Sequence, residues 1–96
     1  MSQQVIVTTD APVALKPLVE AAIRSELRLL ELGLARTAQR LRAFEQQYGM
    51  TSEEFDRRFA VGELAEGLDY IEWAGEIKTY HLLKAQQQAL QNARLH

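Results

Sequence analysis

Apolar residues recur at alternating intervals of four and three positions over a long stretch of the chain. The row is Ile23, Leu27, Leu30, Leu34, Thr37, Leu41, Phe44 and Tyr48, in which Thr37 is the one polar member. This is the spacing of a coiled-coil seam on an α-helix. Pro17 is tolerated only in the first turn of a helix, and Gly49 suits the left-handed position after its last residue. The pattern therefore predicts a long helix over about residues 17–48.

A second apolar row accompanies the first half of this helix. Its members are Leu18, Ala22, Leu29 and Leu32, and the same row continues as Arg36 and Gln39. One packed helix covers one stripe, so a second stripe needs a second partner. A helix about 48 Å long also exceeds what the remaining chain can enclose, unless the helix is kinked in a monomer. We therefore expect a homodimer, joined through Leu18, Ala22, Ile23, Leu27, Leu29, Leu30, Leu32 and Leu34.

The four residues from Thr51 to Glu54 have the sequence of a capping box. The side chain of Thr51 is expected to accept a hydrogen bond from the amide of Glu54, whose carboxylate reaches back. Met50 and Phe55 occupy the two positions of a hydrophobic staple. These signals predict a short helix over about residues 52–60.

A similar signature precedes a second long helix. Asp69 is expected to be the N-cap, with Glu72 as its third-position partner and with Leu68 and Trp73 as a second staple. The apolar stripe that follows is Tyr70, Trp73, Ile77, Tyr80, Leu83, Gln87 and Leu90. This pattern predicts a helix over about residues 70–94.

Together these elements predict an all-α fold. We expect an elongated, coiled-coil-like antiparallel hairpin over residues 13–96, with a short helix joining two long ones. Residues 1–12 are expected to form an extended tail, in which the β-branched run 5–9 is strand-like. Because no other segment is predicted to be a strand, we expect this run to be disordered, or to pair with its own copy or with a partner's sheet.

Charge is concentrated in the middle of the chain. The net charge is −2 overall, but residues 49–76 carry two arginines against eight acidic residues. Such a block attracts cationic partners and repels nucleic acid, although a solvated loop rich in capping acids is the favoured interpretation. Seven residues are expected to bind a partner: Glu53, Glu54, Phe55, Asp56, Phe59, Tyr70 and Trp73. The alternative is that the four aromatic residues simply pack the corner.

Residues suited to catalysis are scarce. The chain has no cysteine and no glycine-rich phosphate loop, and no serine has an identifiable acid–base partner. Glu72 and Glu76 lack the histidine that a di-iron bundle places three residues further on. We therefore expect a non-enzymatic protein with no catalytic, cofactor-binding or metal-binding residue. The chain also lacks a membrane-spanning run and the basic start of a signal peptide, so we expect a cytoplasmic location without membrane contact.

Three arginines lie close together without an intervening acid: Arg36, Arg40 and Arg42. They are the one candidate for weak nucleic-acid binding. Pairing within the chain is the favoured interpretation, because Glu45 lies three residues from Arg42. In addition, an antiparallel helix would bring Glu72 and Glu76 alongside the same stretch. Nucleic acid is therefore not an expected partner.

Three segments, residues 27–37, 44–55 and 69–76, resemble a largely uncharacterised family of short helical proteins from bacteria and archaea. The resemblance covers about residues 17–83, although the glutamine-rich end departs from the family, in which charged residues are more usual. The family's genes often lie beside that of a small toxin-like protein, which implies an antitoxin-like role and no active residue. We therefore expect a protein-binding module that masks a small basic toxin. The alternatives are a structural coiled-coil adaptor and the weak nucleic-acid binder.

Overall fold

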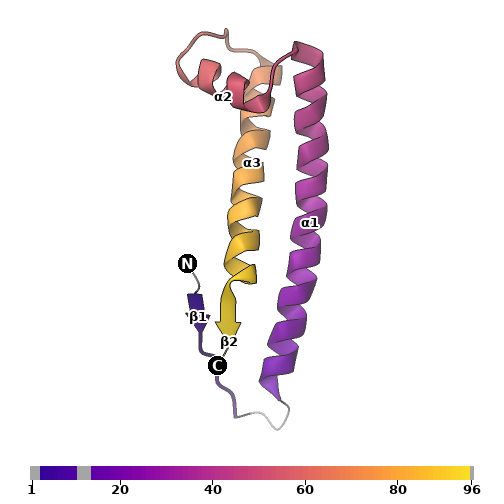
Figure 1. Cartoon of the computed structure of the whole chain (residues 1–96), viewed down its shortest axis with the longest axis vertical. Helices are drawn as coiled ribbons and strands as arrows, with labels where there is room; N and C mark the ends of the chain where they lie inside the picture. The colour runs from indigo at the N-terminus through magenta and orange to yellow at the C-terminus, as the bar shows by residue number, and fades with distance from the viewer. Residues whose placement is uncertain (1–2, 11–13, 96) are drawn as a thin grey trace.

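The computed structural model describes residues 3–10 and 14–95. In chain order, the elements are β1 (Gln3–Val5), α1 (Leu15–Tyr48), α2 (Ser52–Ala60), α3 (Leu68–Gln91) and β2 (Ala93–Leu95). The helices α1 and α3 run antiparallel side by side, and α2 lies across the end where α1 stops and α3 begins (Figure 1). The molecule measures 59 × 22 × 18 Å. The predicted elongated antiparallel hairpin is confirmed.

The predicted seam of α1 faces α3. Each of its members from Ile23 to Tyr48 is buried or half-buried, and Leu30, Leu34 and Thr37 are the most deeply covered. The stripe of α3 from Tyr70 to Leu90 is covered in the same way. Burying one leucine side chain stabilises a fold by about 1.5–3 kcal/mol, so the two matching stripes hold the hairpin together.

One glycine of α1 lies close to a leucine side chain of α3. A Cβ atom added to Gly33 would lie 3.2 Å from the Cδ1 atom of Leu83 on α3. That separation is tighter than ordinary van der Waals contact, so a side chain at this position would push Leu83 aside. The sequence pattern places Gly33 on the helix but does not indicate this contact.

The corner between α1 and α2 forms largely as predicted. Gly49 has a left-handed φ of 65°, and its amide donates to the carbonyl of Glu45 at 2.9 Å. The side chain of Thr51 accepts a hydrogen bond from the amide of Glu54 at 3.1 Å. The second half of the capping box differs, because the Glu54 carboxylate lies 3.9 Å from Arg57 instead of reaching back. The first long helix begins at Leu15, two residues earlier than predicted.

The start of α3 differs from the prediction that Asp69 is its N-cap. Its N-cap is Gly67, without a side-chain cap, whereas Asp69 lies inside the first turn. The Asp69 carboxylate accepts a hydrogen bond from the hydroxyl of Tyr48 on α1. Leu68 is 72% exposed while Trp73 is fully buried, so these two residues do not form the expected staple. The Asp69 carboxylate, which the local sequence predicted to cap the helix, is instead bonded to Tyr48 of α1.

The two ends of the chain also differ from expectation. The helix α3 ends at Gln91 rather than near residue 94, and β2 follows it. The strand β1 pairs with β2 in parallel, so the prediction that the N-terminal strand has no partner within the chain was wrong. The strand itself is Gln3–Val5 instead of residues 5–9. Beyond the end of α3, β2 runs beside the N-terminal strand β1 (Figure 1). Residues 1–2 and 11–12 of the predicted tail lie outside the described residues.

Candidate protein-binding surfaces

The four aromatic residues predicted for partner binding lie in or against the core. Phe55 and Trp73 are both 0% exposed, and their rings stack with centroids 4.0 Å apart. The ring of Phe44 also stacks on Trp73, at 5.5 Å. Phe59 and Tyr70 are half-buried against the same cluster. The expectation of exposed aromatics therefore fails for Phe55 and Trp73, and packing of the corner is their role.

A buried serine joins the three helices at this corner. The amide of Ser52 donates to the Glu45 carboxylate of α1 at 2.8 Å, and its hydroxyl accepts from the Trp73 indole N–H of α3 at 2.9 Å. The Glu45 carboxylate at the N-terminus of α2 satisfies a free amide and suits the positive end of that helix. The predicted interaction of Glu45 with Arg42 is replaced by this cap. The sequence signal for it was weak, because Glu45 and Ser52 belong to different helices.

A second polar contact fastens the start of α3 to the end of α1. The Tyr48 hydroxyl donates to Asp69, to which the Gln47 side chain also donates at 3.4 Å. This hydrogen bond, together with burial and the negative charge of Asp69, raises the pKa of Tyr48 from its usual 10.0 to about 12. The folded chain therefore holds the Tyr48 proton more tightly than the unfolded chain does.

The raised pKa of Tyr48 predicts a loss of stability at high pH. The stabilisation is complete below pH 10 and is lost as the pH rises from 10 through about 12, because the unfolded chain releases the proton first. We expect Tyr48→Phe to lower the free energy of unfolding at neutral pH and to make its decline above pH 10 shallower. Urea unfolding followed by circular dichroism at several pH values measures both effects. Tyr80→Phe is the matched control, and equal slopes for the Tyr48→Phe variant and the parent chain would contradict the role of this hydrogen bond.

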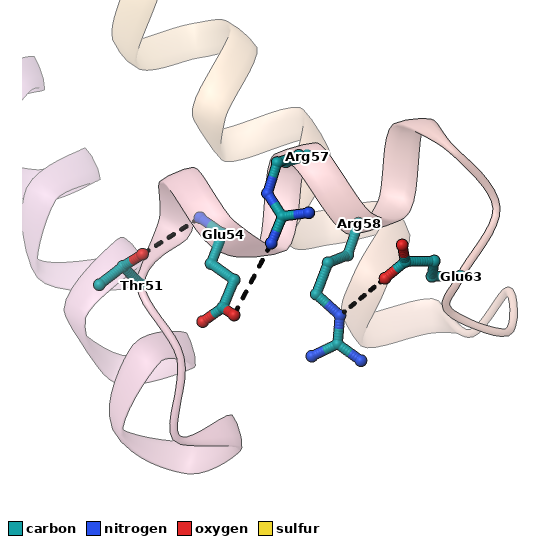
Figure 2. Close-up of polar contacts among 5 residues, drawn as sticks. All are labelled: Thr51, Glu54, Arg57, Arg58 and Glu63. Carbon is teal, nitrogen blue, oxygen red and sulfur yellow. Dashed lines mark hydrogen bonds and ion pairs between the residues drawn. The ribbon is translucent and has the colours of Figure 1, made fainter.

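The exposed face of α2 is acidic. Figure 2 shows Glu54 near Arg57 and Arg58 near Glu63, with N···O distances of 3.9 and 3.3 Å. These pairs engage both arginines of the acidic block with acids of the same block. Glu53 and Asp56 are exposed and take part in none of the ion pairs among the described residues. The surface carried by Glu53, Glu54 and Asp56, called the acidic face below, therefore keeps an excess of negative charge.

A hollow of about 300 Å³ lies beside the acidic face, between the three helices. Glu53 and Asp56 line it together with Arg42, Tyr80 and His81. Its lining residues carry charges of both signs, Arg42 from α1 and the two carboxylates from α2. Within residues 3–10 and 14–95, no three His, Cys, Asp or Glu side chains are arranged to hold a metal ion.

The eight residues predicted to form the oligomer interface divide into two sets. Leu30 and Leu34 are buried within the chain against α3, and Ile23 and Leu27 are half-buried. The other set is exposed and contains Leu18 at 59%, Leu29 at 61%, Leu32 at 66%, and Ala22. An apolar stripe of α1 therefore remains uncovered by the rest of the described chain.

The arginine cluster is partly engaged within the chain. Arg40 forms an ion pair with Glu76 of α3 at 3.0 Å, as the antiparallel arrangement predicted. The second carboxylate oxygen of Glu76 is buried and has no hydrogen-bond partner among the described residues. Arg36 and Arg42 form no ion pair in that part of the chain.

Comparisons with protein-family models, curated proteins and solved structures find no match for this chain. None of the helices in the described part of the chain has both the length and the apolar character needed to cross a membrane.

Proposed function

We propose that this chain is a non-enzymatic protein-binding module that associates with a second copy of itself through α1. The observation that carries the proposal is the exposed set Leu18, Leu29 and Leu32, each more than half accessible on one helix. Exposed leucines aligned along one face of a helix are typical of an interface. The stripe is separate from the seam that closes the hairpin, so covering it does not require the fold to open.

The same proposal includes a second partner at the acidic face. The partner is a small basic protein whose nucleic-acid-binding surface is covered by Glu53, Glu54 and Asp56, in the manner of an antitoxin. The unpaired carboxylates of Glu53 and Asp56 support this part, since complementary charge speeds encounter and selects partners. The resemblance to a family encoded beside toxin-like proteins supports it as well. The buried residues Phe55 and Trp73 take no direct part and instead hold α2 in place.

Charge reversal at the acidic face tests this second partner. We expect the triple variant Glu53→Lys, Glu54→Lys and Asp56→Lys to bind the basic partner about tenfold or more weakly at low salt, because three attractive charges become repulsive. The partner is first obtained by co-purification with the tagged chain from its native host, and its affinity is then measured by titration calorimetry at two salt concentrations.

A matched control separates this local effect from a change in net charge. The variant Asp10→Lys, Glu20→Lys and Glu31→Lys makes the same change in net charge at exposed positions away from α2. We expect it to bind as the parent chain does, with the helicity of both variants close to that of the parent. Unchanged affinity of the triple variant at the acidic face would exclude the electrostatic mechanism.

A structural coiled-coil adaptor is the second candidate function. It is favoured by the ion pairs of Arg57 and Arg58 with acids of the same block. Acidic residues that serve only solubility would be paired within the chain in this way. An adaptor would self-associate but would yield no stoichiometric basic partner on co-purification. The nucleic-acid alternative loses support from the engagement of Arg40 with Glu76.

A further inference from the structure

The exposed apolar stripe of α1 is part of a longer row. Positions spaced alternately by four and three extend from one end of the helix toward the other, in the pattern of a coiled-coil seam. This outer row consists of Leu18, Ala22, Ser25, Leu29, Leu32, Arg36, Gln39 and Ala43, and all eight are exposed. From Leu18 to Ala43 it spans about 38 Å at the rise of an α-helix. The molecule therefore presents a second seam on a face of α1 that is not turned toward α3.

We propose that a second copy of the chain docks antiparallel along the outer row, with the two-fold axis passing between positions 30 and 31. Leu29 of each copy then packs against Leu32 of the other at the centre of the interface. This inference rests on the proposed self-association and specifies its direction and register.

The register matches side chains along the whole row. From the centre outward, the facing pairs are Leu29 with Leu32, Ser25 with Arg36, Ala22 with Gln39, and Leu18 with Ala43. Leucine meets leucine at the centre. In the next layer Arg36 meets the hydroxyl of Ser25, which also accepts a hydrogen bond from Arg28 of its own chain at 3.0 Å. Farther out, a small residue faces a larger one in each pair, which allows close packing of two helices. By symmetry, each of these pairs occurs twice.

Charge complementarity selects this register. Arg36 of one copy lies beside Glu26 of the other, which follows Ser25 in the chain and flanks the seam. Both side chains are exposed, and neither takes part in an ion pair among the described residues. The antiparallel pairing therefore supplies each of them with a partner of opposite charge.

Other arrangements lack this complementarity. A parallel dimer would place Arg36 against Arg36 of the other copy, with like charges in the seam. An antiparallel register shifted by one heptad would place Arg36 against Leu18 in one direction and against Leu32 in the other. Covering a guanidinium with a leucine removes its water without providing a hydrogen-bond partner, which is costly.

The surroundings of α1 leave room for the second copy. Figure 1 shows α2, α3 and both strands on the same side of α1, with the other side of the helix uncovered along its length. Two copies joined in this way would form a layer with the two α1 helices at its centre and the two α3 helices outside them.

Disulfide cross-linking tests the direction and the register together. The natural chain has no cysteine, so Ala22→Cys and Gln39→Cys introduce one thiol each at exposed positions. Mixing and oxidising the two variants should produce a linked dimer, seen as a doubled mass that is lost on reduction. Either variant alone should stay unlinked, because its two thiols would be about 26 Å apart along the helices, whereas a disulfide needs Cα atoms within about 7 Å.

The outcomes of this experiment separate the two proposals. Linked dimers in the single-variant samples would indicate a parallel pair and overturn the inference. Light scattering that shows a dimer, without linkage in the mixture, would overturn the register and leave self-association standing. A monomer at high concentration would contradict both the self-association and the geometry that rests on it.

A charge exchange provides an independent measurement. Arg36→Glu alone and Glu26→Arg alone should each weaken the dimer about tenfold, since like charges then meet across the interface twice. The double variant should restore the dissociation constant of the parent chain. Arg24→Glu, an exposed change on another face of α1, should leave that constant unchanged. A double variant that is no better than the single ones would exclude the contact between Arg36 and Glu26.

Discussion

Replacing Trp73 with alanine should lower the free energy of unfolding by about 3–5 kcal/mol, the range for large aromatic truncations in a core. Trp73 is fully buried, its ring stacks on those of Phe55 and Phe44, and its indole N–H is bonded to Ser52. A single domain is typically stable by only about 5–15 kcal/mol. We therefore expect a lower urea midpoint, measured by circular dichroism because this is the only tryptophan in the chain.

Smaller changes at the same corner separate packing from hydrogen bonding. Ser52→Ala keeps the ring of Trp73 but leaves its buried N–H without an acceptor, at a cost of about 1–3 kcal/mol. Trp73→Phe removes the donor and part of the ring. Because both changes remove the same hydrogen bond, the double variant should lose less than the sum of the two single losses. A loss below about 1 kcal/mol for Trp73→Ala would mean that the corner is not the centre of the core.

Alanine substitution of two adjacent leucines should have very different effects on the free energy of unfolding. Leu30 is 5% exposed in the seam with α3, whereas Leu29 is 61% exposed on the outer row. We expect Leu30→Ala to lower the free energy of unfolding by about 2–5 kcal/mol. Leu29→Ala should change the stability of the dissociated chain by no more than about 0.5 kcal/mol, because most of this side chain is exposed.

Self-association should show the reverse order of effects, with Leu29→Ala more damaging than Leu30→Ala. The proposed dimer contains two copies of Leu29 at its centre, so truncating both should weaken it by at least about a hundredfold. Light scattering over a concentration series measures this effect. Urea unfolding at concentrations low enough to give monomers measures stability separately. A dimer that withstands Leu29→Ala would show that the outer row is not the interface, and a stable Leu30→Ala variant would contradict the assigned seam.

Local and periodic signals predicted much of the fold. The seam of α1, the stripe of α3, the left-handed Gly49 and the Thr51 cap all follow from residues a few positions apart, and the structure contains each of them. Their physical basis lies within one helix turn or one helix period, so no knowledge of the distant chain is needed. The acidic character of α2 is likewise a property of composition alone.

Several contacts between distant segments could not be predicted from the sequence, because they depend on how the folded chain brings those segments together. Local rules made Asp69 a helix cap, but its carboxylate bonds to Tyr48, which lies 21 positions earlier. The pairing of β1 with β2 joins segments from the two ends of the chain, which no single segment reveals. Similarly, both apolar rows of α1 were visible in the sequence, but which of them faces α3 was not. Periodicity defines the faces of one helix, whereas the neighbour that covers each face is selected by packing against the whole chain.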